Sequence, residues 1–209
     1  MHFPKHYPGF KAVPTTVHDA SIWVGKNYFD LQNPNPAEIH LSDIARGLSR
    51  ECRYNGHGRE FYSVAEHSVN CVLLFNRYSS GDIFTDPFLR DIASDILMHD
   101  AHEYVCKDQT SPLKRLIAPL YNPIADRIQA AISARFNLAE CAPEWVKRVD
   151  IEMLAAEKLD LMPDAPDDWP VLANITAPEI FIWCHYPEVA EANFVDMAER
   201  LGISNRWSA

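Results

Sequence analysis

The sequence predicts an all-α protein, a bundle of short helices that forms one domain over residues 1–209. Apolar residues recur at spacings of three and four along several segments, which is the period of an amphipathic helix. Fifteen prolines divide these segments into short lengths, because proline begins a helix more readily than it continues one. We expect a helical core at about 41–160, preceded by an irregular arm and followed by helices that pack on it.

The composition limits what the chain binds. A formal net charge of −10 argues against a nucleic-acid polymer, because contact with the phosphate backbone needs a basic face. A small phosphate ligand needs only a few local cations and a metal ion, so it stays compatible. Five cysteines without a CxxC spacing favour a reduced, cytoplasmic protein. No signal-peptide core or membrane-length apolar run occurs in the sequence.

The first 40 residues read as irregular, with a short strand at 21–24. A helix is expected at Leu41–Cys52, with Ser42 as its N-cap. Ser63 and Glu66 fit a capping box that begins the next helix, which extends to about residue 75. His67 then lies inward, on the same face as Val64, Cys71 and Leu74. Taken alone, His67 is explained more simply by a hydrogen-bonded histidine in the core than by a metal ligand.

The central helix begins at Asp86-Pro87 and contains Ile92, Ile96, His99 and Glu103 on one face. His99 is followed directly by Asp100, so an imidazole and a carboxylate can reach the same cation. Such a pair is weak evidence by itself, since His18 and Asp19 form another without a helical pattern around them. A polar loop is expected at 107–112, and a further helix from Asn122-Pro123.

Pro143 begins the next expected helix, and Asp150 lies on its apolar stripe. A carboxylate in that position is costly unless it is paired or binds a metal. The alternative to a metal is an ion pair with Arg148 or with another helix. An acidic loop at 163–170 follows, and a last pair of helices is expected from Pro178 and Pro187.

Four polar groups thus stand on inward faces of three expected helices: His67, His99, Asp100 and Asp150. Two imidazoles and two carboxylates suit one borderline divalent cation, such as Mn²⁺, Fe²⁺, Co²⁺, Ni²⁺ or Zn²⁺, better than Ca²⁺. Mg²⁺ also remains among the candidates. The sequence therefore predicts one metal site with these four residues as ligands.

The order H…HD…D resembles that of the HD-domain metal-dependent phosphohydrolases. The segments SVAEHS around His67, HDAHE from His99, and SPLK at 111–114 are similar to the 5′-deoxynucleotidase branch and its phage relatives, among them phage dATP triphosphohydrolases. That branch has an arginine and an aromatic residue about fourteen positions before the first histidine. Arg53-Tyr54 occupies this place, with tyrosine where the bacterial nucleotidases have tryptophan. The likeness covers roughly residues 41–155.

The resemblance implies a hydrolase of free deoxynucleotides that acts at the 5′ phosphate. Glu103 and Asp100 would be catalytic, with Glu103 positioning water or handling a proton; its alternative role is to hold a ligand histidine in the right tautomer. The implied substrate contacts are Arg53 and Lys114 to phosphate, Asp108 to the sugar hydroxyl, and Pro112 and Tyr54 to the base.

The preferred substrate is a deoxynucleoside triphosphate, dATP first, which would give deoxynucleoside and triphosphate. The alternatives are a 5′-deoxynucleotidase acting on monophosphates, a phosphodiesterase or alarmone hydrolase, and a non-catalytic scaffold that senses nucleotides. The expected partners are the deoxynucleotide and further copies of the chain, with no nucleic-acid polymer and no membrane. The expected compartment is the cytoplasm, that of the host if a phage encodes the chain.

Overall fold

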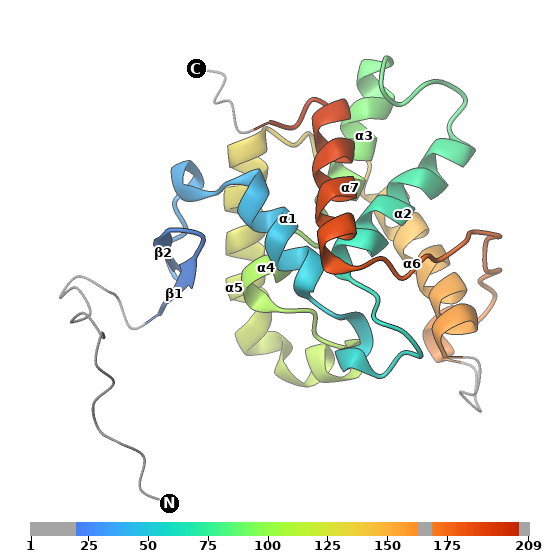
Figure 1. The fold of residues 1–209 in the computed structure, drawn as a ribbon, viewed down its shortest axis with the longest axis horizontal. Coiled ribbons are helices and arrows are strands. Elements are labelled where there is room, and N and C mark those ends of the chain that lie inside the picture. The colour runs from blue at the N-terminus through green and yellow to red at the C-terminus, as the bar shows by residue number, and fades with distance from the viewer. Residues whose placement is uncertain (1–19, 163–168, 205–209) are drawn as a thin grey trace, which may run out of the picture.

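The computed structural model describes residues 20–162 and 169–204, and within them the predicted all-α architecture is confirmed (Figure 1). The α-helices of these residues are α1 (Leu41–Arg50), α2 (Val64–Tyr78), α3 (Pro87–Leu97), α4 (Glu103–Cys106), α5 (Ser111–Phe136), α6 (Pro143–Leu161) and α7 (Pro187–Arg200). Short 3-10 turns occur at Pro36–Glu38, Arg53–Gly56 and Pro170–Leu172.

Helix α2 is the centre of the bundle, since α1, α3, α6 and α7 all pack against it (Figure 1). Its buried residues include the apolar Val64, Val72, Leu74 and Phe75 and also the polar His67 and Asn70. Buried side chains from all the packing helices join in one apolar cluster, with Ile44, Leu48, Ile96, Met153 and Phe194 fully or almost fully covered. Burial of this kind stabilises the fold by roughly 1.5–3 kcal/mol for each large side chain.

The expected strand at 21–24 is present as β1 (Ser21–Val24), and it pairs antiparallel with β2 (Asn27–Asp30). Gly25 supplies the positive φ of 57° that the connecting turn requires. Phe29 is buried and meets the Tyr104 ring edge-on at 5.8 Å, which attaches the hairpin to α4. The irregular region expected over 1–40 is therefore partly ordered, and residues 1–19 lie outside the described part.

Local sequence signals set several helix starts correctly. Ser63 Oγ accepts from Glu66 N at 3.1 Å, Asp86 Oδ1 accepts from two N–H groups of α3, and Pro143 begins α6. The second bond of the predicted capping box, from the Ser63 backbone N–H to the Glu66 carboxylate, does not form. The Glu66 carboxylate instead accepts backbone N–H groups of the segment 183–185, at 3.0, 3.0 and 2.7 Å. Ser42 is not an N-cap either, because α1 already includes Leu41.

The predicted end of the central helix is wrong. Helix α3 ends at Leu97, so it does not continue through Glu103, which instead begins α4. Met98 leaves helical geometry (φ −101°, ψ 7°), and the His99 ring takes the Ile96 carbonyl as its acceptor at 2.7 Å. His99 and Asp100 therefore lie in a turn between two helices, not on a helix face.

Helix α5 is also longer than predicted, since it runs from Ser111 through Pro119 and Pro123 to Phe136. A proline inside a helix removes one hydrogen bond and crowds the carbonyl four residues earlier. Here both prolines are exposed, so water can bind the carbonyls that they leave without a donor. The buried residues of α5 all lie in its second half, from Ala125 onward.

The helix expected from Pro178 is absent from the described residues, whereas the one from Pro187 is confirmed as α7. The reason is that three consecutive N–H groups at 183–185 are bound to the Glu66 carboxylate. Those groups cannot then donate to carbonyls four residues earlier, as a helix requires. Of the acidic loop expected at 163–170, residues 163–168 lie outside the described part.

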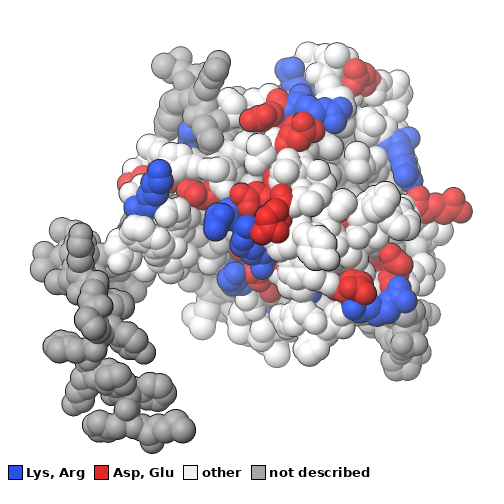
Figure 2. Space-filling view, viewed as in Figure 1, with Lys and Arg blue, Asp and Glu red and all other residues white. Residues whose placement is uncertain are grey.

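No helix in the described ranges is both long enough and apolar enough to cross a membrane. On the face seen in Figure 2, acidic and basic side chains are interspersed among uncharged ones.

Gly47 allows α1 and α4 to approach closely. A Cβ at this position would lie 2.8 Å from Tyr104 Cβ and 3.0 Å from the Tyr104 carbonyl oxygen. We expect Gly47→Ala to lower the free energy of unfolding by about 1–3 kcal/mol, because the neighbouring backbone must shift. Chemical denaturation would measure this. Gly58→Ala is the control, since its Cβ would meet its nearest atoms at 3.4 and 3.6 Å; an equal loss in both variants would contradict the prediction.

Candidate metal centre

Three residues from separate segments bring donor atoms to one place. His67 of α2, His99 of the turn after α3, and Asp150 of α6 offer atoms that all lie within 4.8 Å of one another. His67 Nε2 is 3.3 Å from Asp150 Oδ1, and His99 Nε2 is 4.0 Å from the same oxygen. A His-His-Asp group of this kind can hold a metal ion. Of the alternatives for Asp150, an ion pair with Arg148 is not formed, because Arg148 pairs with Glu152 at 3.0 Å. The contact of Asp150 with another helix is the one with His67.

Asp100, the fourth predicted ligand, lies beside this group. Its Oδ2 is 3.1 Å from His99 Nε2 and 3.9 Å from His67 Nε2. Both imidazoles and Arg53 oppose the effect of burial and hold the pKa of Asp100 well below its usual range. The four residues that the sequence singled out are thus close together, and both carboxylates are ionised.

The hydrogen bonds on the far side of each imidazole place a proton on Nδ1 and leave Nε2 facing the aspartates. His99 Nδ1 donates to the Ile96 carbonyl at 2.7 Å, and His67 Nδ1 donates to Glu157 Oε1 at 2.6 Å. This is the usual way in which proteins fix the tautomer of a metal-binding histidine. His99 Nε2 is buried and has no hydrogen-bond partner of acceptable geometry. A buried nitrogen of this kind is costly unless it binds something, so the residues fit a divalent cation.

Glu157 is the residue that sequence reasoning missed. Its carboxylate is fully buried on α6 and binds His67 Nδ1, Arg53 Nε at 3.1 Å, and the Tyr54 hydroxyl. Burial alone would raise the pKa of Glu157, but Arg53 and His67 outweigh it and the pKa is lowered. A signal was available, since Glu157 follows Asp150 by seven residues and so lies on the same face two turns later.

The Glu157 contacts change how the expected substrate residues Arg53 and Tyr54 are understood. The Arg53 side chain is only 9% exposed, and its Nη1 is 3.8 Å from Asp100 Oδ2. Tyr54 has a positive φ of 58°, which is uncommon for an aromatic residue. Its ring lies 6.2 Å from that of Trp169. Both side chains are therefore held by the carboxylates around the donor group.

Comparison with known proteins identifies the relatives of this chain. It is 38% identical over 157 residues to the uncharacterized protein YfdR of Escherichia coli K12, an alignment that spans 75% of this chain and 80% of YfdR. The chain belongs to the YfdR family. A second relative, the uncharacterized protein RCAP_rcc00048 of Rhodobacter capsulatus, is 40% identical over 121 residues, which is 57% of this chain and 59% of the relative. No protein-family model matches.

Glu103 lies close to the donor group of this YfdR-family chain. Its side chain is buried and Oε2 has no hydrogen-bond partner. Burial, together with the negative charges of Asp100 and Asp108, raises the pKa of Glu103 well above its usual range. Glu103 therefore keeps its proton to higher pH than Asp100 and Asp150, whose pKa values are lowered. Such a difference between neighbouring carboxyl groups separates the roles of proton donor and ligand.

Two of the remaining expected substrate residues, Asp108 and Lys114, lie near enough to Glu103 to affect its pKa. Lys114 Nζ stands 5.5 Å from the centroid of the Tyr121 ring. Pro112 is exposed in the first turn of α5. The structure therefore places Asp108 and Lys114 near the metal centre. For Pro112 it shows an exposed position at the start of α5 and no contact with the centre among the described residues.

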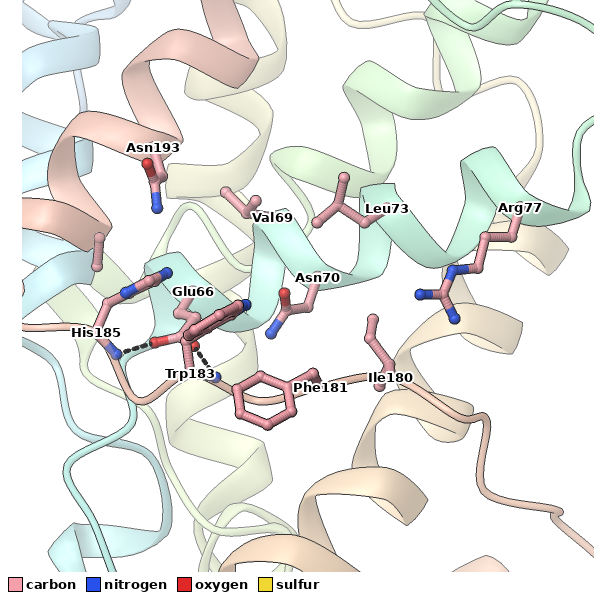
Figure 3. Close-up of a pocket in the computed structure, with 11 residues that line it drawn as sticks. Glu66, Val69, Asn70, Leu73, Arg77, Ile180, Phe181, Trp183, His185 and Asn193 are labelled. Carbon is pink, nitrogen blue, oxygen red and sulfur yellow. Dashed lines mark hydrogen bonds between the residues drawn. The ribbon is translucent and has the colours of Figure 1, made fainter.

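A pocket of about 230 Å³ lies apart from this centre, between α2, α7 and the segment 180–185. Figure 3 shows Trp183, Phe181 and His185 beside it, and the Glu66 carboxylate bound to the backbone of the same segment. None of the expected metal or substrate residues lines this pocket. The YfdR-family centre is consequently defined by its donor atoms and not by this cavity.

We expect Asp150→Ala to weaken binding of Mn²⁺ or Zn²⁺ by at least about 10–100-fold. A 10–100-fold loss of metal affinity is typical when a residue that only supports a ligand is removed, and removal of a ligand itself should weaken binding further. Isothermal titration calorimetry of the metal-free protein measures the affinity. Asp160→Ala on the same helix is the control, because Asp160 is half exposed and pairs with Arg59. Equal affinity in both variants would remove Asp150 from the site.

Proposed function

We propose that this YfdR-family chain is a metal-dependent phosphohydrolase of free deoxynucleotides. The observation that carries the proposal is the directed donor set: two imidazoles whose Nδ1 atoms are hydrogen-bonded, and two ionised carboxylates within 4.0 Å of their Nε2 atoms. Glu103, a buried carboxyl group beside this set with a raised pKa, supports it further. The likeness of the H…HD…D order to HD-domain phosphohydrolases supports the reaction class.

His67, His99, Asp100 and Asp150 would hold the cation. A divalent ion there would supply an acidified water and would neutralise charge that develops on the phosphate. In the reaction the water oxygen bonds to phosphorus as the bond between phosphorus and the 5′ oxygen breaks, and the proton that the water loses passes to solvent. Glu103 donates a proton to the 5′ oxygen, so the deoxynucleoside leaves with a hydroxyl group, and Glu103 takes a proton back from solvent.

The other residues position the substrate. Glu157 keeps the His67 Nδ1 proton in place, so that Nε2 stays available. Lys114, which has no ion pair among the described residues, contacts a phosphate oxygen. Asp108 meets the sugar hydroxyl. The Asp108 carboxylate and the start of α5 would both lie next to the sugar. They would leave little room for a 2′-hydroxyl, so deoxynucleotides would be preferred over ribonucleotides.

The first candidate substrate is dATP, with triphosphate as the product. A specific observation favours monophosphates as the second candidate. Three basic residues near the site in sequence are paired with carboxylates and so are not free to bind the outer phosphates of a triphosphate. They are Arg53 with Glu157, Lys107 with Glu51, and Arg59 with Asp160. Lys114 and the exposed Arg115 are left, and two cations with one metal ion are sufficient for a single phosphate.

Product analysis tests the proposal. The protein is incubated with dATP, dAMP or ATP and with Mn²⁺, Co²⁺ or Mg²⁺, and the products are separated by ion-exchange chromatography. Triphosphate from dATP supports the first candidate, and phosphate from dAMP alone supports the second. Equal rates on ATP would remove the deoxy preference. No turnover with any metal, in protein that binds the metal, would make the chain a nucleotide-sensing scaffold.

A further inference from the structure

Cys71 lies at the metal centre without a role in the proposed reaction. It follows His67 by one turn of α2 and is fully buried. Its Sγ is 3.6 Å from His67 Nε2, the ring nitrogen opposite the Nδ1 that is bonded to Glu157. The sulfur therefore lies on the side of His67 where the cation would be held.

The spacing and the distance both suit a shared ion. Two side chains four residues apart on one helix can bind the same metal, as the two histidines of the H-E-x-x-H motif do. A metal about 2.0–2.1 Å from an imidazole nitrogen and about 2.3 Å from a thiolate sulfur separates the two donors by about 3.1 Å at an octahedral angle and about 3.6 Å at a tetrahedral one. The observed separation of Sγ and Nε2, 3.6 Å, lies at the upper end of this range.

A simpler interpretation is that the thiol only donates a hydrogen bond to Nε2 in the metal-free protein. That bond accounts for the contact, but it sets no preference among metals. A sulfur ligand would set one, because thiolates select Zn²⁺ and Co²⁺ over the oxygen-seeking Mg²⁺. The two interpretations therefore differ in the spectrum and in the selectivity of the loaded protein.

We propose that the Cys71 sulfur is a ligand of the cation beside His67, and that it makes the centre selective for thiophilic metals. The proposal rests on the metal site of the proposed function. On binding, the sulfur–metal bond forms and the thiol proton passes to solvent. Zn²⁺ should consequently be bound much more tightly than Mg²⁺.

Co²⁺ is the probe, because it reports its ligands by absorption. Titration of the metal-free protein with Co²⁺ should give visible ligand-field bands and also a near-ultraviolet sulfur-to-cobalt band. Cys71→Ser should lose the near-ultraviolet band and keep the visible ones, and should bind Zn²⁺ at least about tenfold more weakly with no change for Mg²⁺. Cys106→Ser, which changes a half-buried thiol elsewhere, should retain both bands.

The outcomes separate the two proposals. Visible bands without the near-ultraviolet band in the unmodified protein would overturn the Cys71 ligand and leave the metal site standing. Absence of both bands would overturn the metal site and the sulfur ligand with it. If Cys71→Ser does not fold, the ¹¹³Cd chemical shift of the unmodified protein decides, since a sulfur ligand moves it strongly downfield and a shift typical of nitrogen and oxygen ligands would overturn the proposal.

Discussion

Glu157→Ala should lower the free energy of unfolding by about 3–5 kcal/mol, as expected when one partner of a buried ion pair is removed. Arg53 would stay buried with its Nε facing a cavity where the carboxylate was. The Tyr54 hydroxyl and His67 Nδ1 would each lose their acceptor as well. Urea denaturation followed by circular dichroism measures the change.

Glu152→Ala provides a matched control for that loss. Glu152 is on the same helix and also accepts from an arginine and a tyrosine, Arg148 and Tyr78, at 3.0 and 2.7 Å. Its arginine partner is half exposed, and an ion pair at the surface contributes at most about 1 kcal/mol. If both variants lose the same free energy, Glu157 does not have the central role that its contacts indicate.

Glu103→Gln should reduce turnover by about 10²–10⁴-fold while the protein still binds its metal, because glutamine keeps the shape of the side chain but has no acidic proton. The prediction rests on the proposed function. The rate is measured on whichever nucleotide the unmodified protein hydrolyses, and the metal content of the same sample is measured by mass spectrometry.

Glu51→Gln is the control for the Glu103 substitution. Glu51 is largely covered and pairs with the exposed Lys107, so its loss removes a carboxylate without removing the proposed acid. Loss of metal in Glu103→Gln would instead show that Glu103 is a ligand or holds one. An unchanged rate in metal-loaded Glu103→Gln would remove the proton-transfer role.

The sequence allowed good prediction wherever the deciding interactions are local. Ser63 and Asp86 bind N–H groups two or three residues away, so the starts of α2 and α3 are visible in a short stretch of sequence. Asp150 was recognisable because a carboxylate on an apolar stripe is destabilising unless another segment supplies a charged partner or a metal. The all-α class follows from the same periodicity.

The errors arose where distant contacts outweigh local preference. Glu66 fits a capping box, but its carboxylate binds a segment more than a hundred residues later, and that contact also prevents a helix from Pro178. Glu157 shares the face of Asp150, but its importance depends on Arg53 and His67 from two other segments, which the sequence of α6 does not reveal. The length of α5 was underestimated because exposed prolines cost a helix less than buried ones.

The uneven burial of α5 has a consequence for the dynamics of this chain. Between Ser111 and Ile124 no residue is buried, and two prolines lack the amide that would reinforce the helix; from Ala125 onward the core holds it. Amide hydrogens of the first half should therefore exchange through local opening, well before those of the second half. Pro112 and Lys114 lie on that first half, whereas His67 and Asp150 lie on α2 and α6 in the bundle. The side of the centre proposed to contact substrate can thus open and close while the metal-binding side stays fixed.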